Sequence, residues 1–336
     1  MKNTRNLLGV LAAIAVQWTV SAPAQSTPSQ PYVWRNVVMG GGGFVDGIVF
    51  HPTAKDLMYA RTDVGGAYRW DAASQQWIPL NDWLSPAQNN YTGVESIGLD
   101  PADPNRVYLA AGTYSRSPAA ILRSDDQGKT FEISVVPFHM GGNEDGRSNG
   151  ERLAVDPNDG TILFFGSLRE GLWKSSDRGV TWNAVETFPN TSAVPARPAG
   201  PAASTNVPAR GRRGGGGFGG GGGTAYGIVS VVFDPSSGHS GAPTPVIYAA
   251  VSIGGTNIFR SNDGGVNWQP VAGQPTGLRP SHLIRSVDGL IYITYGNVPG
   301  PNNVTDGALW KYNPKDGSWA DISPEKPAAG QRLGWG

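Results

Sequence analysis

The stretch 59–70 holds the densest group of residues that could do chemistry. Asp63 directly follows an apolar strand expected over 57–60 and precedes a Gly pair, so we expect it at a strand end that faces a loop surface. A carboxylate in that place could take part in catalysis. Tyr68 and Trp70 lie beyond the turn, where a sugar ring could stack on them. The same residues also fit a turn-forming Asp followed by aromatic residues of the core, and periodicity alone favours that structural interpretation.

Other kinds of catalytic site are poorly supported. The chain has no Cys, and its four His residues are scattered without metal-ligand spacing. No G-x-S-x-G nucleophile elbow is present. The segment 128–130 resembles the end of a phosphate-binding loop, but Arg123 stands where that loop needs its first Gly. Any catalysis would therefore use carboxylates, and we expect neither a cofactor nor a metal.

One short pattern occurs three times and indicates which elements must position these residues. Its Ser and Asp can bond nearby backbone N–H groups, its Gly tolerates a positive φ, and its closing aromatic residue supplies an apolar plug. The pattern resembles the Asp-box of β-propeller blades, and we interpret its three acids, Asp126, Asp177 and Asp263, as structural. The three copies are Ser124-x-Asp126-x-Gly128-x-Thr130-Phe131, Ser175-x-Asp177-x-Gly179-x-Thr181-Trp182 and Ser261-x-Asp263-x-Gly265-x-Asn267-Trp268.

The Asp-box belongs to a longer repeat. Each copy follows an apolar run that ends at an Asp-Pro pair, which is typical of a strand followed by a turn. Two degenerate units, 67–77 and 309–319, extend the series at both ends. The closing aromatic residues are separated by 54, 51, 86 and 51 positions, and the long interval contains an insertion. We therefore predict an all-β fold, a β-propeller with about five blade-like units.

The composition and the N-terminal residues indicate the class of protein. The chain has 48 Gly, 27 Pro and 15% charged residues, which favours a turn-rich β architecture. Residues 1–24 resemble a secretory signal peptide, with Lys2 and Arg5 before an apolar stretch and Ala22-Pro23-Ala24 as the cleavage site. Its removal changes the formal charge from +0 to −2, because 24 basic and 26 acidic residues remain. We expect a secreted or periplasmic protein that binds neither nucleic acid nor membrane.

A low-complexity insertion at about 183–227 interrupts the repeat. It is rich in Pro, Ala and Ser and then runs from Arg210 into a Gly tract. Such a stretch cannot bury enough apolar surface to become ordered, so we expect a disordered loop between two blade strands. We expect residues 25–336 to form the propeller around it.

Longer motifs resemble one known family. The match is to the xyloglucanases of glycoside hydrolase family 74, and it covers about 32 to 336 apart from the insertion. These motifs are long and ungapped, so they are far more specific than the Asp-box. They are the stretch 34–52, Arg61-Thr62-Asp63-Val64-Gly65-Gly66-Ala67-Tyr68-Arg69-Trp70, Glu95-Ser96-Ile97-Gly98-Leu99-Asp100-Pro101, Arg147-Ser148-Asn149-Gly150-Glu151-Arg152-Leu153-Ala154-Val155 and 171–177.

The resemblance implies a fold and a reaction. Members of the family have two seven-bladed propellers, with a cleft between them for a branched β-1,4-glucan, and they hydrolyse xyloglucan with inversion by means of two Asp residues. Asp63 matches the Asp of the family's R-T-D-[IV]-G-G motif and would be the general base. Tyr68 and Trp70 would be substrate-binding or supporting residues, although each could equally be a blade plug.

The chain departs from the family pattern in one important respect. It holds about five units of the first propeller and no second propeller, to which the family's general acid belongs. An inverting glycosidase needs two carboxyl groups about 6.5–9.5 Å apart. Asp46, Glu144, Asp145 and Glu151 are other acids in family-like segments, but nothing in the sequence makes them replacements. We therefore expect this chain alone to be inactive and a second propeller to complete the protein.

Two other functions fit the repeat. A non-catalytic propeller that binds a polysaccharide or a protein would share the fold, because propellers have many functions. A sialidase would also use Asp-box blades, but the Arg-Ile-Pro motif expected near its start is missing.

Overall fold

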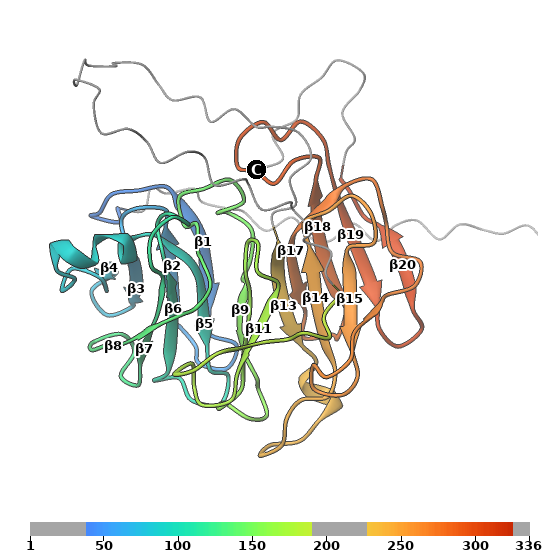
Figure 1. Cartoon of the computed structure of the whole chain (residues 1–336), viewed down its shortest axis with the longest axis horizontal. Helices are drawn as coiled ribbons and strands as arrows, with labels where there is room; N and C mark the ends of the chain where they lie inside the picture. The colour runs from blue at the N-terminus through green and yellow to red at the C-terminus, as the bar shows by residue number, and fades with distance from the viewer. Residues whose placement is uncertain (1–37, 190–226, 325–336) are drawn as a thin grey trace, which may run out of the picture. The chain divides into compact units, whose positions relative to one another are not determined.

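Five antiparallel sheets make up the described part of the chain. The computed structural model describes residues 38–189 and 227–324, so the expected signal peptide at 1–24 lies outside it. Each sheet has four strands that follow one another in sequence and in space (Figure 1). This arrangement confirms the predicted all-β propeller with five blade-like units.

The strands of the first two sheets bracket a short helix. The first sheet contains β1 (Val45–Phe50), β2 (Met58–Thr62), β3 (Ala67–Asp71) and β4 (Gln76–Pro79), and the 3-10 helix η1 (Pro86–Thr92) follows it. The second sheet contains β5 (Val94–Leu99), β6 (Val107–Ala111), β7 (Ala120–Ser124) and β8 (Glu132–Val135).

The remaining three sheets repeat this order. The third sheet contains β9 (Leu153–Val155), β10 (Leu163–Gly166), β11 (Leu172–Ser175) and β12 (Asn183–Ala184). The fourth contains β13 (Ile228–Phe233), the 3-10 helix η2 (Pro235–Ser237), β14 (Ile247–Val251), β15 (Ile258–Ser261) and β16 (Gln269–Pro270). The fifth contains β17 (Arg279–Arg285), β18 (Ile291–Gly296), β19 (Gly307–Asn313) and β20 (Ser318–Asp321).

The Asp-box acids close the turns between the third and fourth strands of the three middle sheets. Asp263 shows the pattern: its Oδ1 accepts from the Asn267 backbone N–H at 2.8 Å and from the Ser261 hydroxyl at 2.8 Å. Hydrogen bonds from the backbone and side chain of Asn267 lower the pKa of Asp263 to about 2. Asp126 and Asp177 make equivalent bonds to Thr130 and Thr181. The turn itself occupies these carboxylates, as a structural role requires.

The core lies between neighbouring sheets. Side chains alternate along each strand, and both faces of an inner sheet are covered. In β6, Leu109 packs toward the first sheet whereas Tyr108 packs toward the third. Four such interfaces join the five sheets in order, and the Asp-box aromatic residues Trp182 and Trp268 lie within two of them. Burial of apolar side chains in these layers stabilises the fold by about 1.5–3 kcal/mol for each large side chain.

The insertion begins later than the sequence indicated. Residues 183–189 are described: Asn183–Ala184 form β12, and Phe188 is buried with its ring centroid 5.1 Å from that of Trp268. This apolar anchor, which composition did not reveal, keeps the start of the segment in the core. The expected disorder of the insertion concerns 190–226, which lie outside the described residues.

The first and fifth sheets, at the two ends of the series, each carry exposed apolar side chains on a face with no neighbouring sheet in the described part of the chain. Ile48 and Phe50 on β1 are 50% and 68% exposed, and Ile284 on β17 is 62% exposed. In a closed propeller each such face would pack against another blade.

Because these faces are exposed, we expect the polypeptide 25–336 to self-associate when it is expressed alone. Exposed apolar patches and open strand edges both promote pairing between chains. We expect concentration-dependent oligomers in size-exclusion chromatography with light scattering, and fewer oligomers for the double variant Ile48→Thr/Phe50→Thr. A monodisperse, cooperatively melting wild-type monomer would contradict this prediction.

Candidate functional site

Asp63 lies in the turn between β2 and β3, directly after the strand that ends at Thr62. Its Oδ1 accepts a hydrogen bond from the Phe44 backbone N–H at 2.7 Å, and its own N–H donates to the Phe44 carbonyl at 3.2 Å. The side chain is 12% exposed. The carboxylate is thus fixed at one oxygen and still reachable from solvent, as a general base requires.

The glycines of the turn allow two backbones to approach closely. A Cβ at Gly65 would lie only 1.7 Å from the Gly42 carbonyl oxygen, and Gly66 adopts φ +87°, which favours glycine. The Thr62 hydroxyl donates to the Gly66 carbonyl at 2.8 Å and accepts from the Gly65 N–H at 2.8 Å. The turn therefore places Asp63 against the segment before β1, where the Phe44 backbone N–H donates to the Asp63 carboxylate.

Tyr68 lies behind this turn. It is 3% exposed, it packs in the core cluster of the first sheet with Ala60 and Trp77, and its hydroxyl donates to the Gly65 carbonyl at 2.9 Å. Trp70 is partly buried, and its ring meets that of Trp77 edge-on at 5.4 Å. Both rings occupy blade-plug positions, and Tyr68 also supports the turn. Their contact with substrate stays a prediction.

Arg61 ties the turn to a distant segment of the chain. Its side chain is fully buried, with Nε 2.8 Å from Glu151 Oε1, and its terminal nitrogens donate to the carbonyls of Arg147 and Asn149 at 2.8 and 2.9 Å. The other oxygen of Glu151 accepts from the Ser96 hydroxyl at 2.7 Å. Because of these contacts, the segment 147–151 lies beside Asp63, although it follows about 85 residues later in the sequence.

Arg147 and Asp46 complete the surroundings of Asp63. Arg147 Nε lies 3.7 Å from Asp63 Oδ2 and 3.8 Å from Asp46 Oδ1. The Asp46 side chain is fully buried, and among the described residues neither of its oxygens has a hydrogen-bond partner. Burial raises the pKa of Asp46 to about 7, although Arg61 and Arg147 lower it. Asp63 is thus the reachable carboxylate of the pair.

The raised pKa of Asp46 predicts a pH-dependent stability difference. The folded state holds the Asp46 proton more tightly than the unfolded state, so this stabilisation is present below about pH 4 and is lost as the pH rises to about 7. An asparagine side chain at this position would carry no charge to bury. We therefore expect the free energy of unfolding of Asp46→Asn, relative to that of wild type, to increase by about 1–3 kcal/mol when the pH is raised from 5 to 8. Melting curves at both pH values measure this, and an equal difference at the two values would refute it.

In the sequence, Asp46 and Glu151 stood out only as acids in family-like segments, and no role was predicted for Arg147. The signals were present in the motifs, because Arg61 and Arg147 stand in two of them. Only the packing shows that these segments meet. Among the described residues no group of three or more His, Cys, Asp or Glu side chains could hold a metal ion. In the same ranges no helix is long and apolar enough to cross a membrane.

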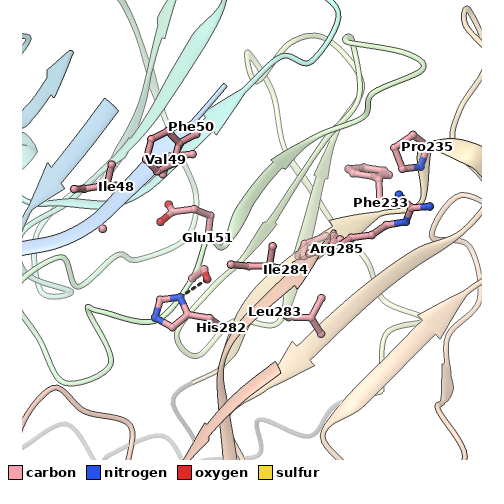
Figure 2. A pocket seen from close by; sticks show the side chains of 14 residues that line it. Ile48, Val49, Phe50, Glu151, Phe233, Pro235, His282, Leu283, Ile284 and Arg285 are labelled. Carbon is pink, nitrogen blue, oxygen red and sulfur yellow. Dashed lines mark hydrogen bonds between the residues drawn. The ribbon is translucent and has the colours of Figure 1, made fainter. Parts of the chain in front are cut away.

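A separate groove of about 620 Å³ lies between the first sheet and the fourth and fifth sheets (Figure 2). Its lining includes Phe50, Ile284 and Arg285, together with His282, whose Nδ1 donates to the Gly150 carbonyl at 2.8 Å. Asp63 does not line it. Its lining includes the exposed side chains of Phe50 on β1 and Ile284 on β17, and we do not assign the candidate site to it.

Comparisons with known proteins relate this chain to one group of enzymes. No family model matches it. A xyloglucanase of Acetivibrio thermocellus is 47% identical over 325 residues, which are 94% of this chain and 36% of the relative. An oligoxyloglucan-reducing end-specific xyloglucanase of Emericella nidulans is 37% identical over 335 residues, which are 94% of this chain and 37% of the relative.

Solved structures agree with the sequence comparison. The family 74 xyloglucanase of Xanthomonas campestris superposes with a TM-score of 0.76 at 48% identity, covering 90% of this chain and 41% of that one. The chain spans roughly a third of the length of the curated relatives it matches. Over that span this chain is similar in both sequence and fold to xyloglucanases, including a solved structure of glycoside hydrolase family 74.

Proposed function

We propose that this chain is the base-bearing part of a secreted glycoside hydrolase that cleaves the β-1,4-glucan backbone of xyloglucan with inversion. Two curated relatives are named xyloglucanases, which supports the substrate class. The observation that carries the proposal is the position of Asp63. Its carboxylate is held by one backbone N–H, remains reachable from solvent and lies beside Arg147.

In this mechanism Asp63 removes a proton from the attacking water. The water then attacks the anomeric carbon from the face opposite the leaving oxygen, which inverts its configuration. The fixed Oδ1 orients the carboxylate, whereas Oδ2 faces Arg147 and the open side of the turn.

The general acid must come from another residue at inverting distance. Asp46 is close enough to share Arg147 with Asp63, but its fully buried side chain cannot reach a leaving oxygen. We place the acid in a second propeller, since the curated relatives are about three times as long as the matched span. The chain alone is then inactive, and the signal-like residues 1–24 direct the protein to the periplasm or the exterior.

The test uses the protein expressed from its complete reading frame. Incubation with xyloglucan should release reducing ends, and proton NMR of the first products should show the α-anomer. Formation of the β-anomer would exclude inversion. Xyloglucan binding without hydrolysis would instead support the alternative, a non-catalytic polysaccharide-binding propeller.

A further inference from the structure

Arg147 is the charged group nearest to the exposed oxygen of Asp63 among the ion pairs of the described residues. Its Nε lies 3.7 Å from Asp63 Oδ2 and 3.8 Å from Asp46 Oδ1, and that nitrogen makes no hydrogen bond within the described ranges. The side chain is 15% exposed. This cation therefore lies between two carboxyl groups without a close bond to either.

Three contacts hold Arg147 in this place. Its guanidinium carbon lies 5.8 Å from the centroid of the Phe44 ring, a cation–π contact. Arg61 donates to the Arg147 backbone carbonyl at 2.8 Å. A terminal nitrogen of Arg147 donates to the Glu144 carbonyl at 3.4 Å. Phe44 thus supports the site in two ways: its backbone N–H donates to Asp63, and its ring lies beneath the Arg147 guanidinium.

The two carboxyl groups do not compete equally for Arg147. Asp63 already accepts a backbone hydrogen bond and is 12% exposed, whereas Asp46 is fully buried without a hydrogen bond in the described part. The charged groups that act on Asp46 are Arg61, Arg147, Asp63 and Glu151, yet burial outweighs the two cations and raises the pKa of Asp46 to about 7. Below that pH, Asp46 is mostly neutral, so Arg147 faces one carboxylate.

We propose that Arg147 is the positioning residue of the general base: seated on Phe44 between Asp46 and Asp63, it holds the Asp63 carboxylate toward the open side of the turn. This inference rests on the proposed role of Asp63. It adds a residue from the segment before the third sheet to a site whose base comes from the first sheet. Asp46 acts as the buried neutral neighbour that leaves the cation to Asp63.

The experiment compares kcat and KM on xyloglucan at pH 5 for the protein from its complete reading frame. A carboxylate that is no longer held toward the open side of the turn activates water poorly, whereas the sugar chain still binds. For Arg147→Gln we expect kcat to fall by about tenfold, with KM within about twofold of wild type.

Two milder variants separate charge from folding. Arg147→Lys keeps the charge and should restore most of the lost kcat. Phe44→Leu keeps the backbone N–H and removes the ring beneath the cation, so it should lower kcat by a smaller factor than Arg147→Gln does, again with little change in KM. Phe44 is 51% exposed, so the Phe44→Leu variant should fold. It therefore tests the role of Arg147 even if Arg147→Gln fails to fold.

The outcomes distinguish the inference from the proposed function. If Asp63→Asn abolishes turnover while the kcat values of Arg147→Gln and Phe44→Leu match that of wild type, Arg147 has no positioning role and the inference fails alone. If Asp63→Asn keeps near wild-type turnover, Asp63 is not the base and both proposals fail.

Discussion

Replacing Asp63 with Asn, in the protein expressed from its complete reading frame, is expected to lower kcat on xyloglucan by about 10²–10⁴-fold. Asn keeps the shape of the side chain and can still accept the Phe44 hydrogen bond, but it cannot take a proton from water. KM should change little, because Asp63 acts on the water rather than holding the sugar chain. Reducing-end assays under saturating substrate measure the loss, and Asp63→Ala should give a similar value.

The Asp-box offers a matched control for this substitution. Asp177 lies in a turn between the third and fourth strands of its sheet, whereas Asp63 lies in a turn between the second and third. Since strands alternate in direction, these two kinds of turn lie at opposite ends of a blade. Asp177→Asn makes the same chemical change and should leave kcat within about twofold of wild type. Equal losses for both variants would show that fold damage, not loss of a base, explains the Asp63 result.

The largest expected loss of stability comes from a second buried ion pair. Arg152 and Glu95 both have fully buried side chains, with Arg152 Nε 3.1 Å from Glu95 Oε1. Burial raises the pKa of Glu95, and the neighbouring Arg152 opposes that rise. In Arg152→Met the carboxyl group of Glu95 loses this cation while it remains in the core. We expect the free energy of unfolding to fall by about 3–5 kcal/mol in urea denaturation.

The double variant tests whether the stranded charge causes this loss. In Arg152→Met/Glu95→Gln no carboxylate is left at this place in the core, and the Gln side chain can still accept from the Gly141 N–H that bonds Glu95 at 3.0 Å. We therefore expect the double variant to regain at least about 1 kcal/mol relative to Arg152→Met. A loss below about 1 kcal/mol for the single variant would show that the pair contributes little.

Local chemistry explains why the sequence predicted so much of the fold. Ser175, Asp177 and Gly179 bond or bend within one five-residue turn, so their spacing alone determines the hairpin. The recurrence of that turn and of apolar runs ending at Asp-Pro, together with two degenerate units at the ends of the series, was enough to predict five blades. The place of Asp63 at a strand end was equally local, because a strand followed by a Gly pair must turn there.

The packing of whole sheets decided what local chemistry could not. Alternation along β3 shows that Tyr68 and Arg69 point to opposite faces, but it does not say which neighbour covers each face. The structure buries Tyr68 and places it under the Gly65 carbonyl. Similarly, composition classed 183–189 with the insertion, whereas the contact of Phe188 with Trp268 keeps that segment in the core.

The site itself combines both kinds of information. The sequence alone determined the base candidate, its turn and the repeated blades, since each depends on residues within a few positions of one another. Only the tertiary structure placed Arg147 and Asp46 beside Asp63. Arg147 lies 84 positions after Asp63 and reaches it because Arg61 and Glu151 connect the first sheet to the segment before the third. Contacts of that range depend on how sheets pack, a property that no single turn or strand pattern encodes.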